Sequence, residues 1–488
     1  MPRQSKIHQI HRVLPPTILT IFGATGDLSA NYLLPALYHM HTHGLLPEDF
    51  RLVCVGRRDL TSEEYLNFIV KKSKRLEELG KPENKKSFLK HLIYFKGDFD
   101  HPESFKPLAE ILADKDVNSQ HACYNRLYYF ATSPELFVTI AQILKSANLL
   151  VSCTGHDRKI RVLVEKPFGS NLASARELNN LLLKFFSEDQ IYRIDHYQGK
   201  ETVQNLIVTR FANSLFEPLW NKENIDHVEI SVLYDDTVGH RAEFYDRVGA
   251  LRDIVQNHAL MMLSLIAMNE PKELTTGDIR QEKFNVLKAL RPYNKTSVQS
   301  HVVKAQYGGY EHELGGQSNT ETYVALKAFV DSERWQGVPF YIRTGKALKS
   351  KITEISVHFK ELPRCLFRGC AANVLTFRIQ PDESVALQIN NKIPGFGIEL
   401  HQSKLDFSFN KAFKGEIPSA YERLLLDFIE GDQRLFMRSD EIEASWKFVD
   451  SIIDNWGDLP MFEYEKKTSG PPQAEEFITK DLKDWWTK

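Results

Sequence analysis

Short apolar runs alternate with longer amphipathic segments along the chain up to about residue 200. Residues 17–22 (TILTIF) form a continuous apolar, β-branched run, which is typical of a strand buried on both faces. A helical pattern of leucines follows and ends at Gly44. Further strands are predicted at residues 51–55, 92–95, 126–131, 160–164 and 191–194. This alternation predicts an α/β fold, a Rossmann-like, doubly wound parallel sheet.

After residue 200 the pattern changes, and strands follow one another without helices between them. Several alternate apolar and polar residues, as antiparallel strands with one buried face do. They are predicted at residues 228–233, 352–359, 374–379, 385–389 and 405–409. We therefore expect a larger α+β domain with a mainly antiparallel sheet. The predicted organisation is a flexible tail (1–14), a dinucleotide-binding domain (15–194), and a substrate-binding and oligomerisation domain (195–488).

Composition excludes several classes of protein. The 488 residues carry a net charge of −2 with 42% hydrophobic content, so no bulk charge attracts nucleic acid or an anionic membrane. No apolar run is long enough to span a membrane, and the N-terminus lacks the apolar core of a signal peptide. The five cysteines form no CxxC pair, which predicts reduced thiols and a cytoplasmic protein.

A glycine-containing turn, GATGDL at residues 23–28, joins the first strand to its helix. Backbone N–H groups at such a helix start can hold a pyrophosphate, although the string departs from GxGxxG and an ordinary tight turn is the alternative. The next strand ends in Gly56, Arg57 and Arg58, where an NAD site would place a carboxylate. A guanidinium suits a 2′-phosphate, so NADP is favoured over NAD; two solvated arginines are the alternative.

The densest chemistry lies in residues 191–201 (IYRIDHYQGKE). Asp195 stands beside three donors suited to a phosphate, namely His196, Tyr197 and Lys200. A buried helix at residues 249–268 carries His258 among other polar residues, which must line a polar cavity to offset the cost of burial. His258 is a candidate general base that Asp195 would orient, and a core histidine is the alternative.

Several lysines follow predicted strands. Lys166 lies between a strand and Pro167, and Lys346 follows the strand at residues 339–345, with Lys351 close behind. Each could reach a sugar phosphate or could simply be solvated. His39, His41 and His43 alternate, but only His39 and His43 share a helix face, and no further ligand completes a coordination shell. No metal is expected.

The ordered motifs GATGDL, GRR, EKPFG, RIDHYQGKE, LRDIVQNH, PFYIRTGK and SAYERLLLDFIEG resemble the glucose-6-phosphate dehydrogenase family along essentially the whole chain. The string DHYxGKE is a specific signature of that family. The resemblance implies oxidation of C1 of glucose 6-phosphate by NADP to 6-phosphogluconolactone, the first step of the oxidative pentose phosphate pathway. NAD is expected as a weaker second coenzyme. The resemblance also implies that the protein forms homodimers or homotetramers through the sheet of the second domain.

The resemblance assigns roles residue by residue. His258 is the implied base and Asp195 its orienting carboxylate, while Lys166 touches both substrate and coenzyme. The phosphate and sugar contacts are expected from His196, Tyr197, Lys200, Asp253, Lys346 and Lys351. The coenzyme contacts are expected from Gly23, Thr25, Gly26, Asp27, Leu28 and Arg57.

Two positions depart from the family pattern. Tyr32 stands where a lysine is common, and Tyr234 stands where an ungapped count back from Asp253 places a sugar-binding glutamate. A lost carboxylate contact would weaken or broaden substrate choice by about 1–3 kcal/mol. Related dehydrogenases of other hexose phosphates therefore stay open as an alternative, and a non-catalytic sugar-phosphate-binding paralogue as a remote one. The sequence also leaves open the oligomer size, the NADP/NAD ratio and a second, structural NADP site.

Overall fold

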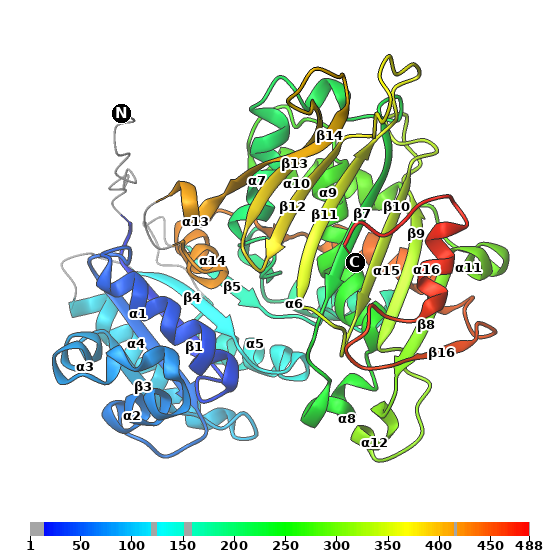
Figure 1. Cartoon of the computed structure of the whole chain (residues 1–488). Helices are drawn as coiled ribbons and strands as arrows, with labels where there is room; N and C mark the ends of the chain where they lie inside the picture. Colours follow the sequence, from blue (N-terminus) through cyan, green and yellow to red (C-terminus); the bar gives the residue numbers. More distant parts are fainter. Residues whose placement is uncertain (1–13, 119–123, 151–158, 414–416, 488) are drawn as a thin grey trace. The chain divides into compact units, whose positions relative to one another are not determined.

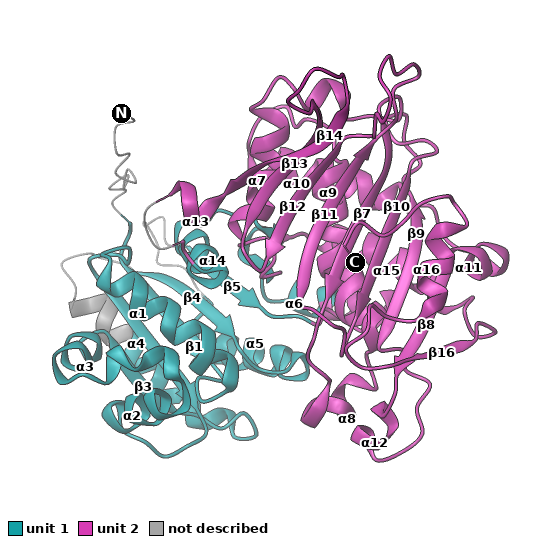
Figure 2. Ribbon diagram, in the orientation of Figure 1, with its two compact units in different colours: residues 1–166, 179–194, 419–436 teal, residues 167–178, 195–418, 437–488 magenta. Residues whose placement is uncertain are grey.

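The computed structural model describes residues 14–118, 124–150, 159–413 and 417–487, which form two compact units (Figures 1 and 2). The first contains residues 1–166, 179–194 and 419–436, and the second the remaining residues. These units differ from the predicted ranges because 167–178 joins the second unit and 419–436 the first. As coenzyme-binding and substrate-binding ranges, 15–194 and 195–488 stay predictions. Most of the expected N-terminal tail, residues 1–13, lies outside the described residues.

Within its described residues, the first unit is built on a seven-stranded sheet of order β15-β6-β5-β4-β1-β2-β3. Its strands are β1 (Thr17–Phe22), β2 (Phe50–Gly56), β3 (Leu92–Lys96), β4 (Asn125–Phe130), β5 (Ile160–Val164), β6 (Ile191–Ile194) and β15 (Phe436–Met437). The helices are α1 (Leu34–Thr42), α2 (Ser62–Lys72), α3 (Pro82–Leu89), α4 (Lys106–Asn118), α5 (Phe137–Ser146) and α14 (Ala420–Glu430), and α6 (Leu172–Leu182) has residues in both units.

The strand order of the first unit reverses beside β1. β1 pairs in parallel with β2 on one side and with β4 on the other, and every residue of β1 is buried. In doubly wound sheets, ligands bind beyond the carboxyl ends of the strands at such a switch point. The turn at residues 23–28 follows β1 directly, so the topology places it where a dinucleotide site is expected. The predicted Rossmann-like architecture is confirmed.

Within its described residues, the second unit is built on a nine-stranded sheet of order β14-β13-β12-β11-β7-β10-β9-β8-β16 (Figure 1). Its pairs are antiparallel except β7–β10 and β8–β16. The strands are β7 (Ile225–Leu233), β8 (Val302–Tyr307), β9 (Tyr323–Phe329), β10 (Pro339–Gly345), β11 (Ile352–Phe359), β12 (Val374–Gln380), β13 (Ser384–Lys392), β14 (Leu400–Ser408) and β16 (Met461–Tyr464). This confirms the predicted α+β domain with a mainly antiparallel sheet.

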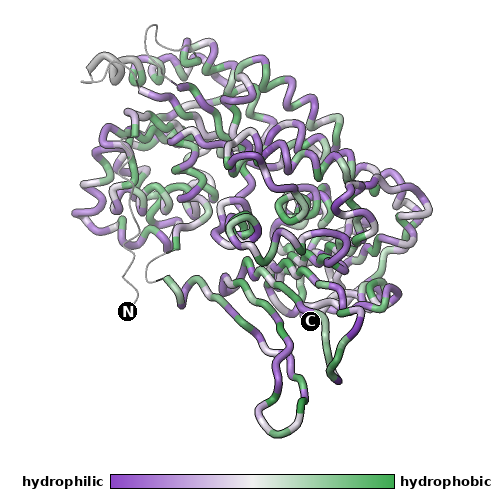
Figure 3. The backbone as a smooth tube through the Cα atoms, turned by 90° about the horizontal axis from the view of Figure 1, so that it is seen from above, coloured by the Kyte–Doolittle hydropathy of each residue, from purple (hydrophilic) through white to green (hydrophobic). Residues whose placement is uncertain are grey.

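Helices cover one face of this sheet in two layers. The π-helix η9 (Leu251–Ala259) packs on β7 and β10, and α9 (Leu260–Ala267) continues it. Two further helices, α10 (Thr276–Lys288) and α15 (Ser439–Ile453), pack on α9 and η9, respectively. The other α-helices among the described residues of the unit are α7 (Glu201–Phe211), α8 (Ala242–Tyr245), α11 (Lys295–His301), α12 (Tyr310–Leu314), α13 (Phe409–Ala412) and α16 (Pro472–Thr479). Hydrophobic (green) and hydrophilic (purple) residues alternate along the helical turns of the chain, as amphipathic packing requires (Figure 3).

The cysteines depart in part from expectation. Cys365 and Cys370, in the exposed loop between β11 and β12, form a disulfide, so the prediction of reduced thiols is wrong for this pair. Their Cα atoms lie 6.3 Å apart, within the reach of a disulfide, because the loop folds back on itself over five residues. Cys54 is buried and free. Cys123 and Cys153 lie outside the described residues. Among the described helices, none is long and apolar enough to cross a membrane.

Candidate active site

A buried carboxylate–imidazole pair lies at the centre of the second unit. Asp195 directly follows β6, and His258 is carried by η9. The two atoms Asp195 Oδ1 and His258 Nδ1 are 2.6 Å apart, and both side chains are 1% exposed. A proton on Nδ1 donates to the carboxylate, which places the lone pair of the neutral ring on Nε2. The structure thus joins the two residues that the sequence predicted to act together.

The electrostatics of this pair keep Asp195 ionised. Burial alone raises the pKa of the carboxyl, but the charge and hydrogen bond of His258 outweigh it and lower the pKa to about 2. The backbone N–H of Tyr197 also donates to Asp195 Oδ1, at 2.9 Å. An ionised partner fixes the orientation of the imidazole.

The segment carrying His258 depends on a tight turn. Gly249 has φ +72°, and a Cβ there would lie 2.5 Å from the carboxylate of Glu321. That carboxylate accepts a hydrogen bond from the N–H of Leu251 at 2.8 Å, at the start of η9. Burial raises the pKa of Glu321 to about 7. π-Helical turns occur often at functional sites, and this one presents His258 towards Asp195.

The predicted anion-binding residues gather beside this pair. The Tyr197 ring lies 4.3 Å from the His258 ring, and the His196 ring lies 4.8 Å from it. Lys200 Nζ stands 4.8 Å from the centre of the Tyr197 ring and donates to Gln380. Burial and the nearby Lys351 lower the pKa of Lys200 to about 8 against the opposing effect of Glu383. A bound anion would stabilise the charged form of Lys200.

A second group of polar side chains lies beside these residues. Lys346 Nζ is 3.7 Å from Asp253 Oδ2 and 3.9 Å from the centre of the Tyr234 ring. The Tyr234 hydroxyl is 3.1 Å from that of Tyr197, so a hydrogen bond connects the two groups. The structure thus brings Asp253 and Lys346 to the predicted site, and Tyr234 with them.

The turn after β10 fixes Lys346. A Cβ on Gly345 would lie 2.4 Å from the ring of Tyr323, so glycine is required there. The N–H of Lys346 donates to the carbonyl of Thr322 at 3.0 Å. Ala347 has a positive φ of 53°, a backbone conformation that is typical of a turn. The backbone therefore holds the lysine at the end of its strand.

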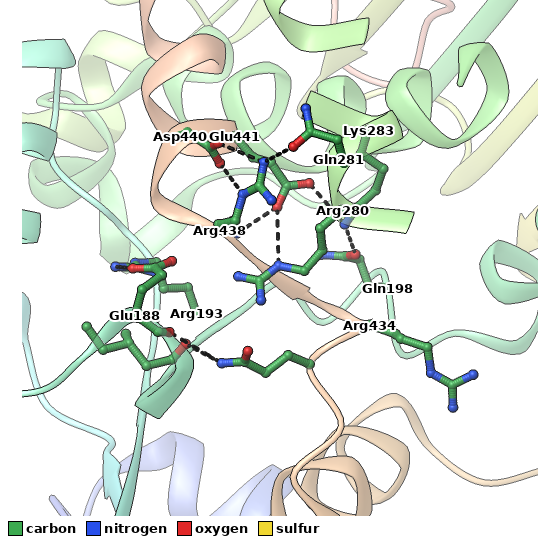
Figure 4. A network of polar contacts seen from close by, with 12 residues as sticks. Glu188, Arg193, Gln198, Arg280, Gln281, Lys283, Arg434, Arg438, Asp440 and Glu441 are labelled. Atoms are coloured by element: carbon green, nitrogen blue, oxygen red, sulfur yellow. Dashed lines mark hydrogen bonds and ion pairs between the residues drawn. The ribbon is translucent and has the colours of Figure 1, made fainter. Parts of the chain in front are cut away.

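A buried polar network, which the sequence did not reveal, supports the segment after Asp195 (Figure 4). Lys283 on α10 donates to Gln198 at 3.0 Å and pairs with Glu441 of α15 at 3.2 Å. Arg280 lies 3.9 Å from the same Glu441. The only sequence signal was the spacing of Arg280 and Lys283, three residues apart on α10. Such a pair of cations is common on solvent-exposed helices.

The turn after β1 in the first unit is closed by its own backbone and depends on Gly23. Gly23 has φ +88°, and a Cβ there would lie 2.3 Å from the carbonyl oxygen of Ala131. The N–H of Gly26 donates to the Gly23 carbonyl at 3.0 Å, which closes the turn. Lys72 binds Asp27 at 2.9 Å and the Thr25 carbonyl at 3.0 Å. Glycine is therefore required at position 23, because the turn packs directly against the backbone of Ala131.

The two arginines after β2 are not equivalent. Both arginines are exposed at the strand end, but Arg58 packs its guanidinium on the ring of Phe68, 4.6 Å from its centre. This arrangement favours Arg57 over Arg58 as a phosphate ligand. Lys166 is half-buried after β5, next to Glu165, which accepts a hydrogen bond from Tyr129 at 2.5 Å. Its contacts to substrate and coenzyme stay predictions.

Two clusters of described residues bring three potential metal ligands together: Asp195, His196 and His258, and His227, Glu229 and His358. In the first, Asp195 already accepts a hydrogen bond from His258. In the second, the imidazole rings stack 4.0 Å apart, and Nε2 of His227 and of His358 lie 3.4 Å and 3.1 Å from Glu229 Oε1.

Comparison with known proteins gives consistent results for both units. Residues 20–205 match the family model "Glucose-6-phosphate dehydrogenase, NAD binding domain", and residues 207–486 match its C-terminal domain. The chain is 41% identical over 485 residues to glucose-6-phosphate 1-dehydrogenase of Borreliella burgdorferi, covering 96% of this chain and 98% of that one. It is 40% identical over 492 residues to the Bacillus subtilis enzyme, covering 97% and 98%.

Among solved structures, a glucose-6-phosphate dehydrogenase in complex with glucose 6-phosphate is similar over 97% of this chain and 99% of that one. The TM-score is 0.89 at 31% identity. These similarities give no support to a non-catalytic paralogue or to a different hexose phosphate.

Proposed function

Since the chain belongs to the glucose-6-phosphate dehydrogenase family and oxidises C1 of glucose 6-phosphate with a nicotinamide cofactor, we propose which of its residues carry the reaction. The hydrogen-bonded pair of Asp195 and His258 carries this proposal. His258 Nε2 takes the proton of the C1 hydroxyl, and Asp195 stabilises the imidazolium that forms. When bound, the nicotinamide accepts the hydride that leaves C1.

The residues around the pair bind and orient the substrate. His196, Tyr197 and Lys200, with Lys351, are the proposed ligands of the 6-phosphate, because charge-assisted hydrogen bonds to phosphate are strong and directional. Asp253 and Lys346 are the proposed partners of the sugar hydroxyls. Fixing both ends of the substrate holds C1 beside His258, which lowers the entropic part of the barrier.

The pKa of Lys200 predicts a pH dependence of substrate binding. With a pKa of about 8, Lys200 is a cation below that pH and loses its charge above it. KM for glucose 6-phosphate should therefore rise by up to about tenfold per pH unit above about pH 8. Steady-state KM measured between about pH 6.5 and about pH 9.5 checks this.

Lys200→Arg is the matched control, since a guanidinium stays protonated throughout this range. The variant should bind glucose 6-phosphate less well at neutral pH, because the guanidinium differs in shape from the ammonium. Its KM should nevertheless rise much less steeply with pH. An identical rise in both proteins would assign the titration to another group.

NADP is the proposed preferred coenzyme and NAD a weaker second one. The proposal rests on the turn at residues 23–28, which follows β1 where the strand order reverses, and on the exposed Arg57 at the end of β2. Arg57 would bind the 2′-phosphate, and Thr25, Gly26, Asp27 and Leu28 would surround the pyrophosphate, with Lys166 between coenzyme and substrate. Initial rates with glucose 6-phosphate and either coenzyme test the proposal. Higher kcat/KM with NADP is expected, and a preference for NAD would contradict the role of Arg57.

We propose that the protein forms homodimers or homotetramers through the second sheet. β14 is an outer strand of that sheet and exposes Leu405 and Phe407, and the adjoining turn exposes Phe396 and Ile398. An apolar patch on an open sheet edge favours a second copy. Analytical ultracentrifugation should give a multiple of 56.3 kDa, and Leu405→Glu with Phe407→Glu should lower it. A monomeric parent protein would contradict the proposal.

The expected cytoplasmic location is likewise a proposal, which cell fractionation tests.

A further inference from the structure

Tyr234 joins the two ends of the proposed substrate site. It is the first residue after β7, and its hydroxyl lies 3.1 Å from the hydroxyl of Tyr197, at the phosphate end. Its ring lies below Lys346, whose ammonium is 3.9 Å from the ring centre. Lys346 in turn lies 3.7 Å from Asp253, at the sugar end. One side chain therefore contacts a proposed ligand of the phosphate and a proposed ligand of the sugar.

The backbone holds Tyr234 rigidly in this place. Its N–H donates to the carbonyl of Gly345 at 3.0 Å, and its own carbonyl accepts from Leu348 at 2.9 Å. Both partners belong to the turn that positions Lys346. The backbones of Tyr234 and of the turn at Lys346 are thus hydrogen-bonded to each other on both sides of the lysine.

The chemistry of a phenol suits this position. Burial, with the nearby Tyr197, Asp253 and Asp195, raises the pKa of Tyr234 well above its usual value. The hydroxyl therefore keeps its proton and can both donate and accept hydrogen bonds. One of these bonds is made with Tyr197, and the hydroxyl can make one more. The ring face stabilises the ammonium of Lys346 by a cation–π contact.

A neutral ring also leaves the carboxylate of Asp253 as the anion beside Lys346. A second acid at position 234 would compete for the same ammonium and repel Asp253. The phenol instead holds the lysine without neutralising it, so that Lys346 can still interact with a substrate oxygen.

We infer that Tyr234 is a positioning and specificity-determining residue, which holds Tyr197 and Lys346 and selects among hexose 6-phosphates through its neutral hydroxyl. The inference rests on the proposed function of Tyr197, Lys346 and Asp253. Tyr234 acts on KM and on the choice of sugar, because the proton transfer belongs to His258 and Asp195.

The test compares three variants with three sugars: glucose 6-phosphate, 2-deoxyglucose 6-phosphate and galactose 6-phosphate. Tyr234→Phe keeps the ring and loses the hydroxyl, whereas Tyr234→Leu loses both. Tyr293→Phe is the matched control, because the Tyr293 hydroxyl donates to the carbonyl of Lys327 at 2.8 Å and is not among the proposed ligands. Melting temperature, kcat and KM are measured for each protein.

Tyr234→Phe should raise KM for glucose 6-phosphate about tenfold and leave kcat within about threefold. Its preference for glucose 6-phosphate over the other two sugars should fall by a similar factor. Tyr234→Leu should lose more, and Tyr293→Phe should keep both KM and sugar preference even if its melting temperature falls.

Unchanged KM and sugar preference in Tyr234→Phe would overturn the inference, as would an equal loss for all three sugars, since a purely structural effect does not discriminate among them. Should Tyr234→Leu fail to fold, Tyr234→Phe decides the question. An inactive parent protein would instead overturn the proposed function, so the two failures are distinguishable.

Discussion

Replacing His258 by asparagine should lower kcat by about 10²–10⁴-fold, the usual contribution of a general base. Asparagine has a similar polar volume but no group that accepts a proton at neutral pH. KM for glucose 6-phosphate should change by less than about threefold, because the proposed ligands of the phosphate and of the sugar hydroxyls stay in place. A loss confined to kcat identifies an interaction of the transition state.

Steady-state kinetics and calorimetric substrate binding check this result together. Glucose 6-phosphate carrying deuterium at C1 should show a larger isotope effect on kcat in the variant than in the parent protein, because the chemical step becomes the slowest. His301→Asn is the matched control, since His301 lies at the end of α11 beside Tyr293 and Phe329. Comparable losses in both variants would point to general destabilisation, and a fully active His258→Asn would remove this histidine from catalysis.

The sequence predicted the parts of the site that depend on local order. β6 ends just before Asp195, and η9 carries His258, because apolar runs and short motifs determine where strands and helices begin and end. The pairing of these two residues was also foreseen, since a buried histidine requires a partner. Local pattern therefore predicted which groups would meet, but not the distances between them.

Contacts between distant segments were not predictable in the same way. Arg161 of β5 donates to the carbonyls of Phe428 and Ile429 in α14, which explains why residues 419–436 pack in the first unit. No periodicity links residues so far apart in the chain. The same holds for the Tyr197–Tyr234 contact and for the network of Lys283 and Glu441, which depend on sheet order and helix packing.

The disulfide shows a different limit. Spacing alone gave no CxxC pair, yet Cys365 and Cys370 meet because the intervening loop reverses direction. Cysteine spacing predicts metal and redox motifs, but loop conformation decides whether two separated thiols approach each other.

Replacing Asp195 by asparagine should lower kcat by about 10²–10⁴-fold, because an amide cannot stabilise the imidazolium and can turn the ring to the wrong tautomer. The 2.6 Å contact to Nδ1 is the physical reason. The pKa of Asp195, about 2 in the folded protein, lies below its ordinary value of 3.8. Its ionisation therefore stabilises the fold above about pH 4, and this contribution is lost as the pH falls through about 2. The stability difference between parent and variant should shrink over that range.

The double variant Asp195→Asn, His258→Asn separates orientation from an independent role. If Asp195 acts only through His258, the double variant should have the kcat of His258→Asn within about threefold, since residues of one catalytic unit are not additive. Asp427→Asn is the matched control: Asp427 is a buried carboxylate of the first unit that pairs with Arg423 at 3.0 Å, outside the proposed site. This variant should retain kcat. Losses that multiply in the double variant would mean that Asp195 contributes to catalysis by a second route.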